Sequence, residues 1–271
     1  MSRKTRLDLL LVARGLAESR SRAQRLIMAG QVKVGGQVAL KPAQQVAPDA
    51  EIEVAQPPRF VSRGGEKLAA ALEAFPIAVA AQVCADVGAS TGGFTDCLLQ
   101  RGAARVYALD VGKGQLHWKL RNDPRVVVME STNARYVERL PEPVTLVTVD
   151  ASFISLRVLL PVVRGWFPAA AEAGEGRRGD VVALIKPQFE AGRREAARGK
   201  GVIRDPQIHR RVLRDILGFA QARGYGARGL MRSPVRGPKG NVEFLVWLTV
   251  GAPPASAEAV GGWIDACVPA R

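Results

Sequence analysis

The stretch that most constrains this chain is a glycine-rich turn, Asp86-Val87-Gly88-Ala89-Ser90-Thr91-Gly92-Gly93-Phe94. An apolar run, residues 79–85, precedes it, and a helical pattern, residues 95–101, follows it. A strand, a glycine-rich turn and a helix together bring backbone N–H groups and a helix N-terminus against a nucleotide-like ligand, and glycine allows a close approach because it has no Cβ. The glycine spacing differs from the G-x-G-x-x-G of dinucleotide-binding enzymes, so a dinucleotide is the weaker candidate ligand.

Apolar runs and helical patterns alternate after this turn. Helices are predicted over residues 66–75, 158–166 and 207–223, and a last strand over residues 243–250. Five of the predicted strands end at or next to polar residues: Asp86, Asp110, Asn133, Asp150 and Lys186. The alternation predicts an α/β fold with a doubly wound, mostly parallel sheet, and in such sheets ligands bind at the carboxyl ends of the strands.

The first 58 residues predict a separate, small α+β domain. Leucines at helical spacing mark a first helix, and Ser19 or Ser21 caps a second one that ends at Gly30. A strand, a glycine turn and a strand follow over residues 32–38, with a last short strand at residues 51–54. Residues 59–63 are predicted to link this domain to the large domain, residues 64–271.

Charge and cysteine content narrow the kinds of partner. The net charge of +14 and the isoelectric point near 10.5 favour a polyanionic partner, and nucleic acid is the commonest one. Cys84, Cys97 and Cys267 have neither metal-binding nor disulfide-framework spacing, which predicts free thiols in a reducing cytoplasm. No apolar run is long enough to cross a bilayer or to form a secretion signal, so we expect a soluble cytoplasmic protein.

The front domain resembles the S-four RNA-binding domain of ribosomal proteins. The resemblance rests on Arg6-Leu7-Asp8-x-Leu10-Leu11 and on Ser19-Arg20-Ser21-Arg22-Ala23, followed by Leu26-Ile27, Gly30, Val32 and Val34. It implies binding of structured RNA, mainly through phosphate contacts and shape. The candidate RNA-binding residues of the whole chain are Arg6, Arg20, Arg22, Arg25, Lys33, Arg59, Arg63, Arg193, Arg198, Lys200 and Arg204.

The glycine-rich turn, together with Asp110 at the end of the next strand, resembles the S-adenosylmethionine site of Rossmann-like methyltransferases. Asp110 lies about 20 residues after Gly88, as expected for an acid that binds ribose hydroxyls. The cofactor-binding residues that the resemblance implies are Asp86, Gly88, Ser90, Thr91, Gly92, Phe94, Asp110, Asn133 and Asp150.

Four further residues, Lys67, Asp150, Lys186 and Glu243, match in order the Lys-Asp-Lys-Glu set of FtsJ-like ribose 2′-O-methyltransferases. The motifs around them, among them Ser62-Arg63-Gly64-Gly65 and Lys186-Pro187-Gln188-Phe189, extend the resemblance, and the whole chain is similar to the TlyA family of ribosomal RNA cytidine 2′-O-methyltransferases. The resemblance implies that Lys186 acts on the hydroxyl proton, that Asp150 and Glu243 orient it, and that Lys67 supplies positive charge. This scheme requires no metal, and the expected partner is ribosomal RNA or a ribosomal subunit.

Two segments of the large domain are predicted to be loops. Residues 171–179 are rich in small residues, and we assign them no function. Residues 190–206 are basic and contain several glycines, which is typical either of a mobile loop that closes over RNA or of a solvated surface loop. The segment after Gly251 is rich in Pro and Ala and is expected to pack, with one short helix.

Three other functions compete with methyl transfer. A pseudouridine synthase also carries such a front domain, but it has no use for the glycine-rich turn. A non-catalytic RNA-binding or ribosome-assembly factor has no need for the complete Lys-Asp-Lys-Glu set. The TlyA family also carries the label haemolysin, but the sequence contains no membrane span, and we find no convincing cationic amphipathic helix that would support membrane action.

Overall fold

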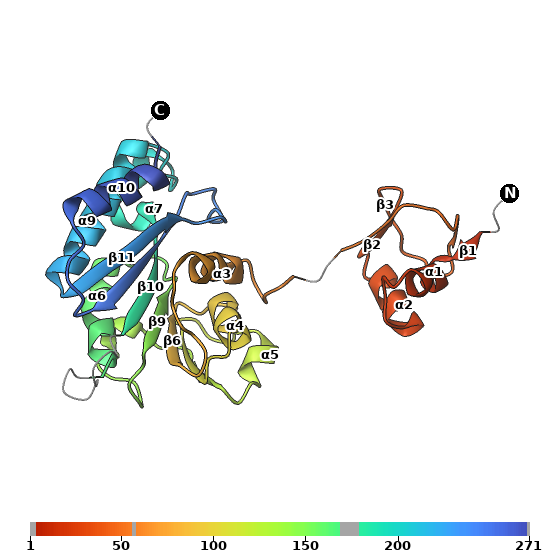
Figure 1. Cartoon of the computed structure of the whole chain (residues 1–271), viewed down its shortest axis with the longest axis horizontal. Helices are drawn as coiled ribbons and strands as arrows, with labels where there is room; N and C mark the ends of the chain where they lie inside the picture. Colours follow the sequence, from red (N-terminus) through yellow and green to blue (C-terminus); the bar gives the residue numbers. More distant parts are fainter. Residues whose placement is uncertain (1–3, 56–57, 169–178, 270–271) are drawn as a thin grey trace. The chain divides into compact units, whose positions relative to one another are not determined.

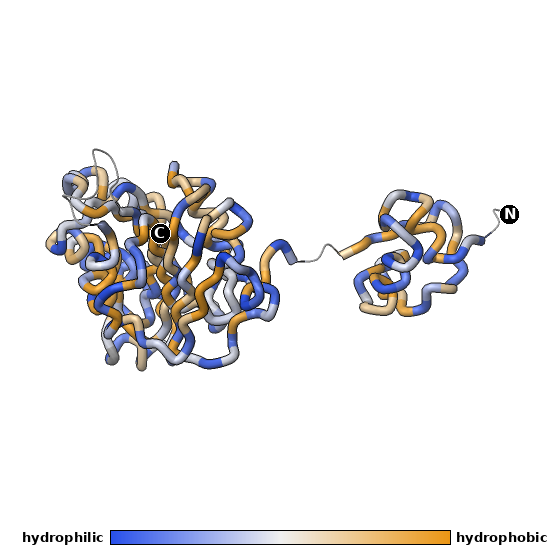
Figure 2. The backbone as a smooth tube through the Cα atoms, turned by 90° about the horizontal axis from the view of Figure 1, so that it is seen from below, coloured by the Kyte–Doolittle hydropathy of each residue, from blue (hydrophilic) through white to orange (hydrophobic). Residues whose placement is uncertain are grey.

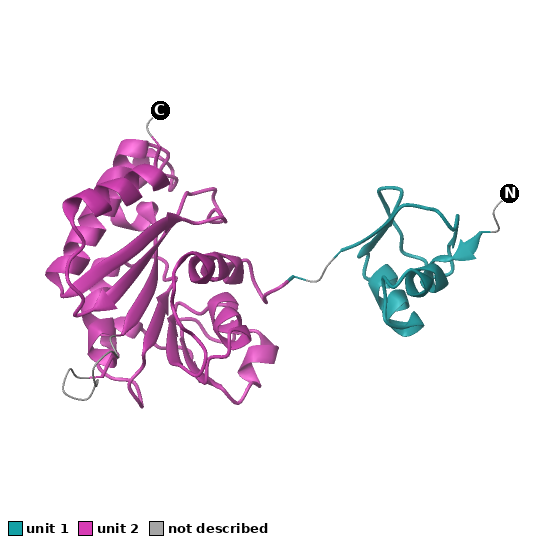
Figure 3. Cartoon of the chain, in the orientation of Figure 1, with its two compact units in different colours: residues 1–58 teal, residues 59–271 magenta. Residues whose placement is uncertain are grey.

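Backbone contacts divide the chain into two units, Met1–Pro58 and Arg59–Arg271 (Figure 3). A computed structural model describes residues 4–55, 58–168 and 179–269. Residues 59–63, expected to be a linker, pack into the second unit instead. The Phe60 ring is only 4% exposed, because it fills the space above Gly65, where a Cβ would lie 2.2 Å from the ring. The backbone N–H of Val61 also donates to Asp96 Oδ2 at 2.9 Å.

The first unit is a small α+β domain, as predicted. Two helices, α1 (Leu7–Ala13) and α2 (Arg20–Met28), enclose a core with short strands: β1 (Thr5–Arg6), β2 (Val32–Val34), β3 (Gln37–Val38), β4 (Gln45–Val46) and β5 (Ile52–Val54). Ser19 caps α2, because its Oγ accepts the N–H of Arg22 at 3.3 Å. Gly35 and Gly36 form the tight turn between β2 and β3, both with positive φ.

The second unit is built on a seven-stranded sheet in the order β11-β12-β10-β9-β6-β7-β8 (Figure 1). Its strands are β6 (Val83–Val87), β7 (Arg105–Leu109), β8 (Val126–Met129), β9 (Leu146–Val149), β10 (Asp180–Ile185), β11 (Tyr225–Arg232) and β12 (Phe244–Val250). Neighbouring strands are parallel except that β12 pairs antiparallel with both β10 and β11. The chain order reverses between β6 and β9, which is the switch point where doubly wound sheets bind ligands.

Helices cover both faces of this sheet and bury an apolar core on each side (Figure 1). One face carries α3 (Gly64–Ala74), α4 (Gly93–Gln100) and α5 (Trp118–Arg121). The other carries α6 (Leu156–Val163), α9 (Pro206–Ala222) and α10 (Ala257–Cys267). The remaining short helices are η1 (Ala134–Tyr136), η2 (Arg164–Trp166), α7 (Pro187–Glu190) and α8 (Arg193–Arg198). Hydrophobic residues concentrate along the central strands in Figure 2. The Rossmann-like α/β prediction is confirmed.

Three local expectations differ from the structure, and a fourth falls outside the described residues. Strand β6 begins at Val83, because the chain turns at Ala81, which has a positive φ. The basic segment 190–206 contains helix α8 and is therefore not a continuous loop. Residues 171–178 of the small-residue segment lie outside the described residues. Strand β11 is not expected from the sequence, because Gly226 and Gly229 interrupt its pattern; a Cβ at Gly229 would lie 2.7 Å from the Phe75 ring.

Candidate active site

The glycine-rich turn connects the carboxyl ends of three strands. Gly88 has a φ of +83°, and a Cβ there would lie 2.7 Å from the carbonyl oxygen of Asp150, so only glycine fits between β6 and β9. The N–H groups of Gly88 and Ala89 donate to the Leu109 carbonyl, at the end of β7. The N–H of Ser90 donates to Asp110 Oδ2 at 2.8 Å. Because of these contacts, the turn and Asp110 form one rigid edge.

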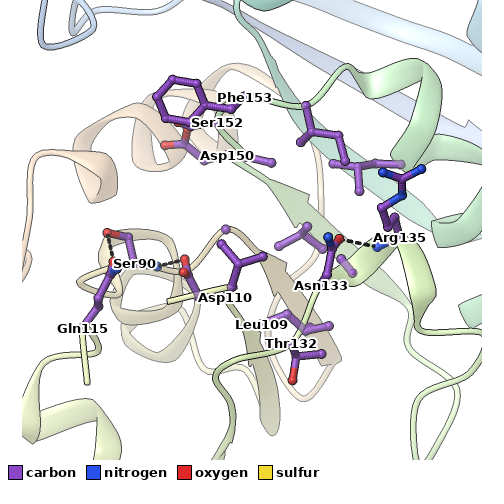
Figure 4. A pocket seen from close by; sticks show the side chains of 17 residues that line it. Ser90, Leu109, Asp110, Gln115, Thr132, Asn133, Arg135, Asp150, Ser152 and Phe153 are labelled. Atoms are coloured by element: carbon purple, nitrogen blue, oxygen red, sulfur yellow. Dashed lines mark hydrogen bonds between the residues drawn. The ribbon is translucent and has the colours of Figure 1, made fainter. Parts of the chain in front are cut away.

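A cavity of about 460 Å³ opens beside this edge (Figure 4). Its polar lining comes from the ends of β6 to β9 and includes Gly88, Ser90, Asp110, Thr132, Asn133, Asp150 and Ser152. Its apolar lining includes Val111, Ala134, Ile154 and Leu159. We call this space the first cavity; its volume lies within the range of small-molecule sites.

The chemistry of the first cavity fits S-adenosylmethionine, which carries an apolar purine, a ribose diol and an amino acid. Asp110 accepts the N–H groups of Ser90 and Gly112, which fixes its carboxylate beside the cavity as an acceptor for hydroxyl groups. Asn133 Oδ1 accepts the N–H of Arg135 at 3.2 Å, which fixes the orientation of its amide. The aliphatic wall at Val111 and Ile154 suits a flat base.

A second cavity, of about 310 Å³, adjoins the first. Lys67, Asp150, Lys186 and Glu243 all line it, although they come from α3 and from the ends of β9, β10 and the segment before β12. Gly88, Ser90, Asp150 and Ser152 line both cavities. These four residues form a shared wall, so a ligand in one cavity lies next to a ligand in the other.

The four charged residues alternate in sign and contact one another in a row. Lys186 Nζ lies 2.6 Å from Asp150 Oδ1, and it donates to Ser152 Oγ at 3.0 Å. Lys67 Nζ lies 2.6 Å from Glu243 Oε2 and 3.9 Å from Asp150 Oδ2. Lys67, Lys186 and Glu243 are buried, which their opposite charges make tolerable. The sequence-predicted set is therefore brought together around one cavity.

Some predicted cofactor-binding residues have other surroundings. Asp86 lines neither cavity: it is fully buried and accepts the hydroxyl groups of Thr95 at 2.7 Å and Thr148 at 3.0 Å. Burial raises the pKa of Asp86 to about 7. Gly92 packs below the turn, where a Cβ would lie 2.2 Å from Leu120. Thr91 and Phe94 line the second cavity rather than the first. Asp86 and Gly92 therefore line neither cavity, and their contact with the cofactor stays a prediction.

Sequence reasoning missed two residues that matter for the first cavity. Glu130 accepts the N–H groups of Gly114, Gln115 and Leu116, and its bond to Arg121 together with these N–H groups lowers its pKa to about 2. It thereby fixes the loop that carries Gln115 into the cavity. Phe153 lines the cavity with 91% exposure and a φ of +64°. The sequence held a signal for each, because Glu130 directly follows a strand and Phe153 lies three residues after Asp150.

The candidate RNA-binding residues of the first unit differ in their contacts. Arg6 and Arg20 both pair with the buried carboxylate of Asp8, at 2.9 and 3.1 Å, whereas Lys33 lies 3.8 Å from Glu53. The bonds to Arg6 are the main cause that lowers the pKa of Asp8. Arg22 and Arg25 are exposed on α2.

The candidate RNA-binding residues of the second unit fall into three groups. Arg59 lies 3.7 Å from Glu73, and Arg63 lines the second cavity. Arg198, Lys200 and Arg204 are exposed at the end of α8 and before α9. The side chain of Arg193 lies outside the described part of the chain.

The residues that could bind metal or form disulfides are dispersed. Across residues 4–55, 58–168 and 179–269, no three His, Cys, Asp or Glu side chains cluster as metal ligands would. Cys84, Cys97 and Cys267 are buried and unpaired. Burial raises the pKa of Cys84 to about 12 and those of Cys97 and Cys267 to about 11.

Known proteins match both units. The FtsJ-like methyltransferase family model matches residues 60–250, and the S4 domain model matches residues 5–52. The 16S/23S rRNA (cytidine-2′-O)-methyltransferase TlyA of Mycobacterium tuberculosis is 49% identical over 252 residues, which cover 92% of this chain and 91% of that protein. Hemolysin A of Brachyspira hyodysenteriae is 40% identical over 250 residues, 89% of this chain and 98% of that one.

A solved structure described as a hemolysin from Streptococcus thermophilus has a TM-score of 0.69 at 40% identity, covering 97% of this chain and 96% of that chain. Despite these names, no helix in the described residues has both the length and the apolar character needed to cross a bilayer. Three findings indicate the same family: the two matched domains, the relatives that match most of the chain, and a first cavity that suits the methyl donor. The chain therefore belongs to the TlyA family, in which an S4 domain precedes an FtsJ-like methyltransferase domain that takes its methyl group from S-adenosylmethionine.

Proposed function

We propose that this chain transfers a methyl group from S-adenosylmethionine to the ribose 2′-hydroxyl of a cytidine in ribosomal RNA. One observation carries the proposal: the first cavity, which suits the methyl donor, and the second cavity, which contains the charged row, meet at Asp150. An acceptor hydroxyl in the second cavity would lie beside both the donor and Lys186. Reactions of this kind depend mainly on such positioning.

The charged row supplies a group for the proton of a ribose hydroxyl and positive charge for its oxygen. S-adenosylmethionine, when bound, offers an electrophilic methyl group on a sulfonium. The hydroxyl is a poor nucleophile until its proton leaves, and Lys186 Nζ is the group assigned to accept that proton, as a neutral amine that has first released its own proton to solvent. Asp150 and Ser152 orient Lys186. Lys67, oriented by Glu243, supplies positive charge near the oxygen as its negative charge develops.

The substrate assignment draws on the front domain and on the relatives. The first unit matches the S4 domain, and the Mycobacterium tuberculosis relative is named for cytidine 2′-O-methylation of 16S and 23S rRNA. The candidate RNA-binding residues of both units, from Arg6 to Arg204, would contact phosphates around the target nucleotide. Ribosomal subunits in the cytoplasm are the proposed partner, and the scheme assigns no role to a metal.

Purified ribosomal subunits and labelled S-adenosylmethionine provide the test. Wild-type protein should label the ribose of a cytidine, as mapped by nuclease digestion of the product. Lys186→Ala should lower the rate by roughly 10²- to 10⁴-fold while RNA affinity survives. Lys119→Ala, a lysine on α5 that lines neither cavity, is the matched control and should keep its activity.

Other outcomes of the same assay would contradict the proposal. Label on a base, or full activity in Lys186→Ala, excludes the assigned chemistry. No label with any subunit, together with tight RNA binding, favours a non-catalytic assembly factor. Leakage of dye-loaded vesicles on addition of the protein would favour the activity for which the Brachyspira relative is named.

A further inference from the structure

A buried asparagine, Asn241, joins two loops beside the second cavity. Its side chain is 3% exposed and lies two positions before Glu243. Its Oδ1 accepts the N–H of Ile203 at 3.0 Å, and its Nδ2 donates to the carbonyl of Gly201 at 2.9 Å. One amide therefore bonds both sides of Val202, and both of its polar atoms have partners, as a buried amide requires. We call this arrangement the Asn241 clamp.

The first loop held by the clamp is the segment 199–204. His209, buried on α9, also holds this segment, because its Nε2 lies 3.1 Å from the Ile203 carbonyl. The Lys239 side chain lies over this segment, with its Nζ 3.8 Å from the position of a Cβ on Gly201. The segment is therefore fixed in place between α9 and the clamp.

The second loop is the segment 233–243, which carries Glu243. The carbonyl of Asn241 accepts the N–H of Gly237 at 3.0 Å, and the N–H of Ser233 donates to the carbonyl of Glu243. Gly237 packs directly on the carboxylate, because a Cβ there would lie 2.6 Å from Glu243 Oε1. A displacement of this loop would therefore move Glu243, and with it the contact to Lys67.

The two loops and the adjoining end of α8 expose a set of basic side chains: Arg198, Lys200, Arg204, Arg236 and Lys239. Among the described residues none of these five has a carboxylate within 4.0 Å, whereas many other arginines of the chain, such as Arg125 and Arg211, do. Arg236 also lines the second cavity. A cluster of uncompensated cations at the edge of the acceptor cavity fits the phosphates that flank a target nucleotide.

We propose that Asn241 is a positioning residue that makes the two loops one phosphate-binding surface and so couples the binding of the RNA strand to the placement of Glu243. The inference rests on the proposed function, because the ligand of the surface is the acceptor RNA. Without the clamp, each loop could still meet a phosphate, but the contact would no longer fix Glu243 against Lys67. The clamp thus affects both the affinity for RNA and the rate of methyl transfer.

Asn241→Asp in the full chain tests the clamp with the smallest change. The aspartate keeps the shape and one acceptor, but it replaces the donor that faces the Gly201 carbonyl with an oxygen. We expect KM for ribosomal subunits to rise and kcat to fall, each by about tenfold or more, since small misplacements of catalytic groups have large effects on rate. Affinity for S-adenosylmethionine, measured by calorimetry, should be unchanged, because the first cavity contains no residue of either loop.

Two further variants separate coupling from simple charge contact. Lys200→Ala combined with Lys239→Ala removes phosphate contacts but keeps the clamp, so KM should rise while kcat stays at the wild-type value. Asn122→Asp makes the same chemical change at an exposed asparagine at the end of α5, and it should alter neither constant. A fall in kcat that only Asn241→Asp shows is the signature of coupling.

Several results would overturn the proposal. The first is a kcat of Asn241→Asp that equals the wild-type value. The second is a fall in kcat in the double lysine variant as large as the fall in Asn241→Asp. Asn241→Ser, which breaks both bonds without adding a charge, guards against misfolding; if neither variant retains S-adenosylmethionine binding, the amide serves the fold and not the coupling. If wild-type protein methylates no RNA, the proposed function fails, and equal RNA affinities of wild type and Asn241→Asp then exclude the clamp as well.

Discussion

Single residues in this molecule compensate buried charge in two different ways. Lys67, Lys186 and Glu243 are buried beside partners of opposite charge, so each ion is stabilised by a neighbour. Asp86 has only the hydroxyl groups of Thr95 and Thr148 as close side-chain partners among the described residues. Ionising this carboxyl therefore costs free energy. Because the carboxyl keeps its proton in the folded chain, the stability of the second unit depends on pH.

The pH dependence of Asp86 is testable with Asp86→Asn. Burial raises the pKa of this carboxyl to about 7 from its ordinary value of 3.8, so between those values the folded chain holds a proton that the unfolded chain has lost. Stability should fall as pH rises through this window, by an amount on the order of 4 kcal/mol at most. An asparagine at this position cannot ionise, so the variant should lack this slope. Urea unfolding across the range from weakly acidic to weakly basic pH measures it.

Tryptophan fluorescence suits this measurement, because all four tryptophans lie in the second unit. Asp49→Asn, which removes one exposed carboxylate from the first unit, controls for net charge. Parallel stability curves for wild type and Asp86→Asn would contradict the assignment.

At the scale of elements, glycines have opposite consequences in two helices. Gly92 is the N-cap residue just before α4 and has a φ of +98°, in a place where a Cβ would collide with Leu120. Gly218 lies inside α9, is exposed, and has open space where a Cβ would be. The first glycine is required by the turn below the cofactor cavity, whereas the second only raises the entropy of the unfolded chain.

Alanine at these two positions should therefore change stability in opposite directions. Gly218→Ala should increase the free energy of unfolding by about 1 kcal/mol, from helix propensity alone. Gly92→Ala should reduce it by roughly 2–4 kcal/mol, because backbone strain and overpacking add. It should also weaken S-adenosylmethionine binding. Chemical denaturation and calorimetry measure both effects, and destabilisation by Gly218→Ala would show that the open space is not available.

Sequence patterns predicted the parts of this site that belong to strand ends. Asp110, Asn133, Asp150 and Lys186 come together because parallel strands end at one edge, which is a rule of topology. Local pattern could not join Lys67 to Glu243, whose partner lies 176 positions away. Their pairing was available only through the family resemblance.

The differences between the sequence predictions and the structure have equally local causes. Asp86 looked like a strand-end ligand, but β6 continues through it, so its side chain points into the core. Strand β11 was missed because its glycines, one of them packed closely on Phe75, have low strand propensity. Packing between segments distant in the sequence determines whether such residues are buried or form a strand. Neither the hydrophobic periodicity nor the composition of the sequence contains that information.

At the scale of the whole molecule, the net charge of +14 matters less than which cations lack acidic partners. Arg6 and Arg20 stabilise the buried Asp8, so their removal would damage the first unit as well as any RNA contact. Arg22 and Arg25 are exposed on α2 without carboxylate partners among the described residues. They are the better probes of RNA binding by the S4 domain.

Replacing both Arg22 and Arg25 by alanine should weaken RNA binding and reduce its salt dependence. Each lost phosphate contact lowers the slope of log K against log salt by about 0.7–0.9, so the double variant should lose about 1.5. Arg105→Ala with Arg125→Ala, which removes two arginines already paired with Glu142 and Asp123, should leave the slope nearly unchanged. Filter binding across a salt series gives both slopes, and equal losses in the two variants would contradict a specific contact by α2.

The shared wall of the two cavities also bears on how such an enzyme can diverge. Residues such as Asp110 line the first cavity alone, and residues such as Lys67 line the second cavity alone, so mutation can change one cavity while selection maintains the other. The shared wall has no such freedom, because a substitution at any of its four residues changes both cavities at once. These residues are Gly88, Ser90, Asp150 and Ser152. The family can therefore acquire new RNA targets at the rim of the second cavity and in the S4 domain, while the wall between the cavities stays under the joint constraint of both ligands.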